Sequence, residues 1–125
     1  MGGSLRNKIS EYITSQYASS PEYLWAKYPN YAVFRHMGNK KWFAVIMDIP
    51  YKKLDLDKEG ITDILNIKVS PLMAGSLELN KGILPAYHMK KGAWVSILLD
   101  GSVDKEQIKA LIAMSYELTD SKKKR

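Results

Sequence analysis

The residue types best suited to chemistry gather in one short segment, "PAYHMKKGAWVSI" at residues 85–97. It holds a histidine, two adjacent lysines and a tryptophan. Histidine changes its charge near neutral pH and is the commonest general acid or base. Lysines contact anions such as nucleic-acid phosphates. The segment therefore raises two hypotheses, a site built around a histidine and a basic surface that binds an anion.

Nucleophilic catalysis finds little support in the residues. His36 and His88 are the only histidines, and the chain contains no cysteine and no G-x-S-x-G nucleophile elbow. Ser96 lies inside a predicted strand beside Trp94, where a packing or hydrogen-bonding role is expected. We therefore expect a protein that is not an enzyme.

A ligand pocket is the alternative that the histidines leave open. Such a site would have to bring His36, Tyr87, His88 and Trp94 together in a concave pocket. Neither a G-x-G-x-x-G motif nor a lysine-bearing phosphate loop occurs. The acidic segment "DLDKEGITDIL" at 55–65 resembles a calcium loop in spacing, but no glutamate follows at its twelfth position. We expect neither a cofactor nor a metal ion.

Basic residues at two predicted turns support a nucleic-acid hypothesis. One pair precedes Trp42 and the other precedes Trp94, so each turn carries cations close to an aromatic ring. Two such turns can straddle a nucleic-acid backbone, because each neutralised phosphate releases counterions. The predicted DNA-binding residues are Arg35, Lys40, Lys41, Lys90 and Lys91. Lysine is also common at exposed turns of any globular protein, which is the simpler interpretation.

The formal net charge of +6 comes mostly from the C-terminal end, "KKKR" at 122–125. Without these four residues the charge falls to +2, a weak electrostatic signal for a dedicated nucleic-acid protein. A terminal basic run is typical of a solubilising end. We expect this tail to assist binding at the turns rather than to form a site itself.

A different class of function, a protein- or peptide-binding adaptor, is also open. It would use an exposed face of the sheet or a groove lined by Tyr28, Tyr31, Trp42 or Tyr87. A contiguous exposed apolar patch would favour this hypothesis, whereas a flat basic face would favour DNA.

The N-terminal half has to form a helix and a hairpin to position these residues. Apolar side chains at helical spacing after Ser4 predict a helix over 5–18. Strands are predicted at 31–36 and 41–49, joined by a tip at 37–39 whose glycine supplies the positive φ of a tight turn. The second strand is apolar on both alternating sets, so both of its faces should be covered.

The C-terminal half alternates strands and helices. We predict a third strand at 62–69, a short helix at 71–79 and a further strand at 93–100, preceded by a loop or hairpin at 81–92. Asp104 and Gln107 form a capping box for the last helix. Its buried face is predicted to carry Ile108, Leu111, Ile112, Ser115 and Leu118.

These elements predict an α+β fold with two layers, in the order α-β-β-β-α-β(β)-α. Helices pack on one side of a small, largely antiparallel sheet. A chain of 125 residues fits one domain, which we place at 1–121, followed by the basic tail at 122–125. The N-terminus lacks the apolar core of a signal peptide, and no apolar run is long enough for a membrane span. We expect a cytoplasmic protein.

Several segments in order resemble one family along nearly the whole chain. They are "EYLWAKYPNYAVFRH", "KKWFAVIMD", "DILNIKVSP", "GILPAYHMKKGAWVSILLDGSV" and "LIAMSYELT". Together they identify the chain as similar to the MmcQ/YjbR family of small bacterial proteins, from about residue 5 to 119.

The resemblance implies a fold and, by analogy, a function. Family members are described as having a fold like CyaY or the type III secretion chaperones, a two-layer α+β arrangement also called a double wing. They are commonly labelled DNA-binding on structural grounds, which is an argument by analogy. In this chain the two wings would be the hairpin around Gly38 and Asn39 and the segment around Lys90 and Lys91.

This sequence departs from the family pattern at the second wing. Many relatives carry asparagine then lysine, with a histidine directly before the tryptophan, where this chain has Lys90, Lys91 and Ala93. A role that needs that histidine does not apply here. The resemblance to CyaY implies no iron site either, since Glu11 is the only acid in the first predicted helix.

Overall fold

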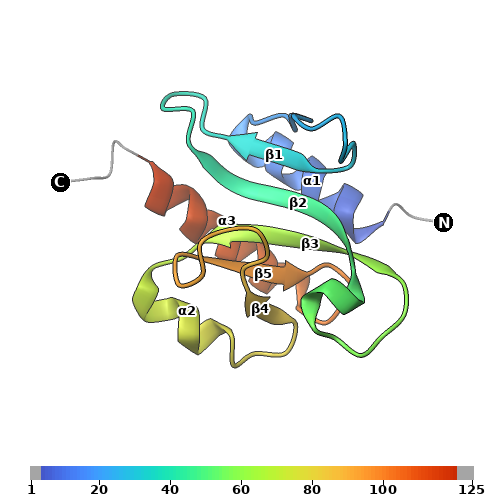
Figure 1. The fold of residues 1–125 in the computed structure, drawn as a ribbon. Helices are drawn as coiled ribbons and strands as arrows, with labels where there is room; N and C mark the ends of the chain where they lie inside the picture. Colours follow the sequence, from blue (N-terminus) through green and yellow to red (C-terminus); the bar gives the residue numbers. More distant parts are fainter. Residues whose placement is uncertain (1–3, 121–125) are drawn as a thin grey trace.

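Five antiparallel strands form one sheet in the computed structural model, which describes residues 4–120 (Figure 1). The strands are β1 (Ala32–Arg35), β2 (Trp42–Pro50), β3 (Ile61–Lys68), β4 (Ile83–Pro85) and β5 (Trp94–Leu98). Their order across the sheet is β1-β2-β3-β5-β4, and each neighbouring pair is antiparallel. The predicted α+β class is confirmed. The predicted tail at 122–125 lies outside the described residues.

Three helices cover one face of this sheet. They are α1 (Leu5–Tyr17), α2 (Pro71–Leu77) and α3 (Lys105–Thr119), and a short 3₁₀ turn, η1 (Tyr51–Leu54), follows β2. In Figure 1, α1 and α3 lie behind the sheet. Among residues 4–120, no helix has the length and apolar character needed to cross a bilayer.

The helix starts follow the predicted capping chemistry. The Ser4 side chain accepts a hydrogen bond from the Asn7 amide, 3.1 Å away, and Asp104 accepts one from the amide of Glu106 at 3.0 Å. Both bonds satisfy amides that have no partner within the helix. The capping-box contact expected with Gln107 is replaced by this bond to Glu106.

The tip of the β1–β2 hairpin differs from the prediction. The positive φ belongs to Lys40, at 66°, and not to Gly38. Asn39 explains how a lysine adopts this conformation: its side-chain oxygen accepts a hydrogen bond from the Lys41 amide at 2.8 Å, and its Nδ2 donates to the Thr119 carbonyl, also at 2.8 Å. The tip is thus tied to the end of α3.

The main core lies between the sheet and the helices. Ile9 and Ile13 of α1, and Ile108 and Ile112 of α3, are fully buried against sheet residues that include Phe43. Burial of such side chains contributes about 1.5–3 kcal/mol each, which makes this layer the principal source of stability. The predicted helix-side packing is therefore confirmed.

The opposite face of the sheet, called the open face below, has no α-helix over it among residues 4–120. Its buried side chains are Tyr31, Val33, Val45, Met47, Ile49, Ile64 and Leu98. Residues from irregular segments partly cover them, among them Trp25, Leu56 and Tyr87. Both faces of β2 are covered, as predicted, but the open face carries a thinner and less regular layer. Because this layer is irregular, it leaves hollows on the open face.

Candidate functional site

Both predicted basic turns lie at the same end of the sheet. Lys40 and Lys41 directly precede β2, and Lys90 and Lys91 lie shortly before β5. β2 and β5 each pair antiparallel with β3, so they run in the same direction on its two sides. Their first residues therefore flank the end of β3, and Figure 1 shows both turns on the left of the molecule. We call this region the basic end.

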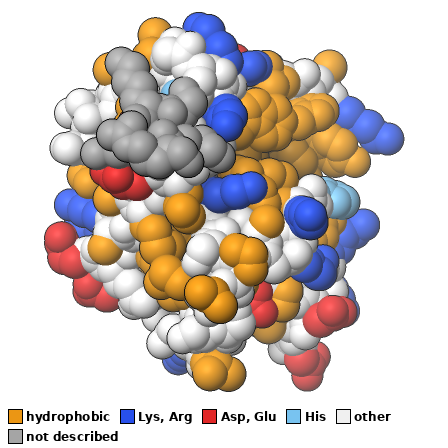
Figure 2. Space-filling view, turned by 90° about the vertical axis from the view of Figure 1, so that its left-hand side faces the viewer, with side chains coloured by type: hydrophobic (Ala, Val, Ile, Leu, Met, Phe, Trp, Pro, Cys, Tyr) orange, Lys and Arg blue, Asp and Glu red, His pale blue; other side chains and the backbone are white. Residues whose placement is uncertain are grey.

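A groove of about 410 Å³ lies between the two strand starts. It is lined by Lys41, Trp42, Lys68, Trp94, Leu118 and Thr119, and we call it the tryptophan groove. The Lys68 ammonium lies 5.6 Å from the centre of the Trp94 ring, close enough for a cation–π contact. Figure 2 looks onto this end and shows basic side chains around an apolar patch.

Two of the five predicted DNA-binding residues have partners within the protein. Arg35 donates from Nε to Glu22 at 3.1 Å, and Lys91 donates from Nζ to the Ala86 carbonyl at 3.0 Å. The Glu22 carboxylate offsets the charge of Arg35. Lys91 closes the turn that carries it.

The other three, Lys40, Lys41 and Lys90, are exposed. None of them forms an ion pair with a residue in the part of the chain that the structure describes. Their ammonium groups are therefore available to an anion at the basic end.

A second hollow opens on the open face beside the tryptophan groove. Its volume is about 200 Å³. It is lined by Trp25, Tyr28, Tyr31, Trp42, Val45, Met47, His88 and Met89, and we call it the aromatic pocket. Trp42 belongs to both hollows, so the pocket and the groove are adjacent.

Edge and face contacts between rings fix the walls of the aromatic pocket. The Trp25 ring stands perpendicular to the Trp42 ring, with centroids 5.9 Å apart, and edge-on to Tyr31 at 5.8 Å. Tyr28 stacks on Tyr31 at 4.7 Å. These are the arrangements that aromatic quadrupoles prefer, so the rings hold each other in place.

Tyr31 is one half of the stacked tyrosine pair in the wall of the aromatic pocket. Burial raises the pKa of Tyr31 above its usual value of 10.0, and the proximity of Tyr87, Tyr28 and Asp48 raises it further. Tyr31 is therefore neutral at physiological pH, and it brings no negative charge to the pocket.

A buried polar pair holds the loop that forms one side of this pocket. Asn66 donates from Nδ2 to the Tyr87 carbonyl at 2.9 Å, and the Ser96 hydroxyl accepts from the Tyr87 amide at 2.9 Å and donates to Asn66. Both side chains are fully buried, where an unpaired polar group would be costly. The hydrogen-bonding role expected for Ser96 is confirmed, and Asn66 is its partner.

The tryptophan groove, the aromatic pocket and two further hollows each contain only some of the four residues of the predicted ligand pocket. Tyr87 and His88 lie with their rings 4.1 Å apart on the open face, and Trp94 lines the tryptophan groove. His36 lines a separate hollow with residues from the β1–β2 tip. These hollows do not join His36 to the other three residues, and the four-residue pocket stays a prediction.

His36 is packed inside the protein against α3. Its ring is 4% exposed and stacks on Tyr116 of α3 at 4.0 Å. Its Nε2 lies 2.7 Å from the Thr119 hydroxyl and 3.0 Å from the Tyr116 carbonyl. The adjoining Tyr17 also packs on Tyr116, and burial, followed by its neighbour Tyr12, raises the pKa of Tyr17 to about 12. This cluster joins β1 to the helices.

The residues of the two hollows that sequence reasoning missed include Trp25, Lys68 and Met89. Trp25 stands in an aromatic segment whose pattern indicates core packing, and Met89 stands between His88 and Lys90, two residues with stronger functional signals. One signal was available for Trp25, the three aromatic residues that stand between two prolines in "PEYLWAKYP".

Comparison with known proteins places the chain in a family. A family model described as YjbR matches residues 14–118. A protein of Bacillus subtilis (strain 168), named uncharacterized protein YyaQ, is 44% identical over 114 residues, covering 91% of this chain and 97% of that protein.

Solved structures agree with this placement. A crystal structure of a Pseudomonas syringae protein has a TM-score of 0.90 at 41% identity, and covers 92% of this chain and 98% of that chain. Protein DR2400 of Deinococcus radiodurans shares the fold, with a TM-score of 0.65 at 22% identity over 92% of this chain and 80% of its own. The family model over residues 14–118 and the 44% identical relative show that the chain belongs to the YjbR family.

Proposed function

We propose that this protein binds nucleic acid at the basic end and catalyses no reaction there. The observation that carries the proposal is the convergence of two turns, far apart in sequence, on the two sides of the tryptophan groove. Lys41 and Lys68 line this groove together with two indole rings. Cations beside aromatic rings suit a phosphate backbone with its bases.

The proposed contacts are few, so the binding should be weak and sensitive to salt. Lys40, Lys41 and Lys90 present free ammonium groups, whereas Arg35 and Lys91 are occupied. Each neutralised phosphate of duplex DNA contributes about −0.9 to the slope of log affinity against log salt. Three lysines therefore predict a slope of roughly −3.

The first prediction tests these lysines by fluorescence anisotropy with a labelled DNA of mixed sequence. Affinity is measured between roughly 20 and 200 mM salt, a range in which counterion release changes it strongly. Replacing Lys41 and Lys90 together by alanine should weaken binding at low salt and reduce the slope by roughly 2.

The matched control removes the same charge elsewhere. Lys8 of α1 and Lys105 of α3 are also exposed, and the Lys8→Ala, Lys105→Ala double variant lowers the net charge equally. It should leave the slope near that of the unmodified protein. Equal losses in the two double variants, or no binding at low salt, would overturn the proposal.

A second candidate, binding of a peptide, is favoured by the aromatic pocket itself. Apart from His88, every residue that lines it is aromatic or aliphatic. A peptide anchored by an apolar side chain would bind with little dependence on salt, because burial of apolar area is not screened. Under this alternative, Lys41→Ala with Lys90→Ala would change affinity little.

A further inference from the structure

The aromatic pocket is too small for a whole ligand but suits part of one. Its volume of about 200 Å³ lies below the roughly 300–1,000 Å³ of most small-molecule sites. One planar ring system fits such a volume. The remainder of the ligand would then lie outside, over the surface around the pocket.

Each chain segment that builds the pocket carries a lysine on that surface. Lys27 directly precedes Tyr28, Lys41 precedes Trp42, and Lys90 follows Met89. All three lysines are exposed, and within residues 4–120 none of them forms an ion pair.

The walls of the pocket can stack on an inserted ring. Trp25 and Trp42 both line the pocket, and their rings stand perpendicular to each other. One face of the Tyr28 ring stacks on Tyr31. Tyr28 is nevertheless 43% exposed, so its other face is accessible. Aromatic side chains in this setting accept any base, since every base has a π face.

The pocket is held open before a ligand arrives. Hydrogen bonds from Asn66 to Tyr87 and from Lys91 to Ala86 fix the loop that carries His88 and Met89. A preformed site avoids the entropic cost of ordering a loop on binding.

We propose that the aromatic pocket receives one unpaired base of a single-stranded nucleic acid, whose flanking phosphates contact Lys27, Lys41 and Lys90. This inference rests on the proposed function and names the nucleic acid that the protein prefers as ligand. A ring with a negative group on each side is the repeat of a nucleic-acid strand. In a duplex the faces of each base are covered by the neighbouring bases, and a paired base has to be extruded at a cost in free energy before it can enter the pocket. Single strands are therefore preferred.

The experiment compares three labelled nucleic acids at one low salt concentration: an oligothymidylate, the same strand with abasic sites throughout, and a duplex of equal length. The oligothymidylate should bind more tightly than the abasic strand, by roughly 5- to 150-fold if one base stacks. It should also quench tryptophan fluorescence, since two of the three tryptophans line the pocket.

Two variants and a control locate the effect. Trp25→Ala and Tyr28→Ala should each reduce the preference for thymidylate over the abasic strand, and Tyr28 is exposed enough for its variant to fold normally. Tyr23→Ala removes an aromatic ring that is 56% exposed in the same segment but does not line the pocket. It should leave the preference unchanged.

The outcomes separate this inference from the proposed function. Equal affinity for the abasic and the thymidylate strands, with a steep salt dependence retained, would overturn the base pocket and leave nucleic-acid binding standing. Absence of any salt-dependent binding would overturn both. Binding of an uncharged aromatic peptide that Trp25→Ala abolishes, with no binding of thymidylate, would assign the pocket to peptides instead.

Discussion

At the scale of single residues, Gly82 and Gly60 adopt the same left-handed backbone conformation in different surroundings. Their φ angles are +87° and +98°. A Cβ added at Gly82 would lie 2.7 Å from Cγ2 of Val103 and 2.8 Å from Cβ of Ser102, whereas one at Gly60 would meet nothing within 4 Å. Gly82 therefore combines a conformational requirement with a steric one.

The second prediction uses this pair. Gly60→Ala should lower the free energy of unfolding by about 1 kcal/mol, from backbone strain alone. Gly82→Ala should cost roughly 1–3 kcal/mol more, because the added methyl group overpacks the contact with Val103. Urea unfolding of both variants measures the difference. Equal losses would show that the chain around Gly82 relaxes without cost.

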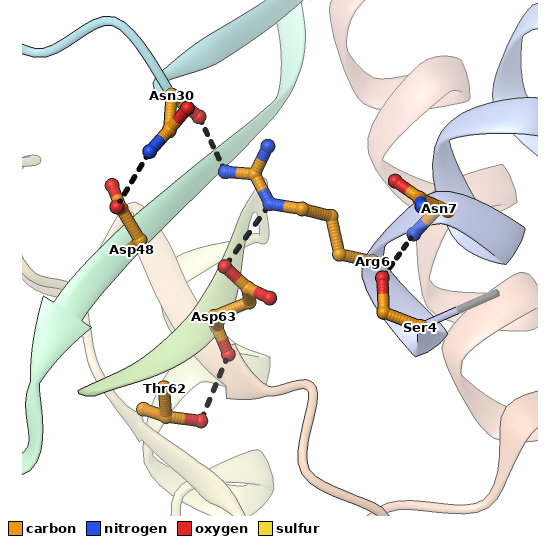
Figure 3. A network of polar contacts seen from close by, with 7 residues as sticks. All are labelled: Ser4, Arg6, Asn7, Asn30, Asp48, Thr62 and Asp63. Carbon is orange, nitrogen blue, oxygen red and sulfur yellow. Dashed lines mark hydrogen bonds and ion pairs between the residues drawn. The ribbon is translucent and has the colours of Figure 1, made fainter. Parts of the chain in front are cut away.

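At the scale of elements, the side chain of Arg6 links α1 to the sheet (Figure 3). Asp48 of β2 and Asp63 of β3 are directly paired in the sheet, an arrangement in which like charges are destabilising. Arg6 of α1 donates from Nε to Asp63 at 3.0 Å and from Nη2 to the Asn30 carbonyl, and Asn30 donates to Asp48 at 3.0 Å. Arg6 therefore compensates the acidic pair while it anchors α1.

The third prediction removes this anchor. Arg6→Ala should lower the free energy of unfolding by roughly 1.5–3 kcal/mol, the range for hydrogen bonds to charged groups, because its side chain is only 17% exposed. Lys8→Ala, an exposed change on the same helix, should cost less than about 0.5 kcal/mol. Denaturant unfolding compares the two variants.

A double-mutant cycle tests whether the contact itself is responsible. Adding Asp63→Asn to Arg6→Ala should cost less than Asp63→Asn does alone, because the bond between the two side chains is already lost. Strict additivity of the two changes would show that Arg6 acts through its bond to Asn30 or through helix packing, and not through Asp63.

At the scale of the whole molecule, the two faces of the sheet are covered in different ways. Helices cover one face, while irregular segments cover the other. The three tryptophans of the chain, Trp25, Trp42 and Trp94, all line the hollows of the open face or of the basic end. Tryptophan fluorescence and helical circular dichroism therefore report on opposite layers.

The fourth prediction is that both signals change together. The strands contribute side chains to both layers, so loss of the sheet should disrupt the two at once, as in a two-state domain. Urea transitions followed by tryptophan fluorescence and by circular dichroism at the helix band should coincide. A fluorescence transition at lower urea would show that the layer over the open face opens first, which would contradict a preformed pocket.

Local rules in the sequence predicted most of the elements and only part of the candidate site. Ser4 and Asp104 mark helix starts by their own side chains, so these boundaries were readable. The buried face of α3 was not fully readable: Leu118 is 42% exposed and Thr119 is buried, because Thr119 contacts His36. Helical spacing alone cannot tell which of two adjacent residues a distant strand will contact.

The sequence by itself determined the α+β class, the helix caps, the alternation of the strands and the two basic turns, since each depends on residues near one another in the chain. Tertiary structure alone decided that the turns meet at one end, that Arg35 and Lys91 are occupied and that His36 is packed against α3. It also assembled the aromatic pocket from Trp25, Trp42 and Met89. These outcomes depend on strand order and on contacts between distant segments, which no local pattern encodes.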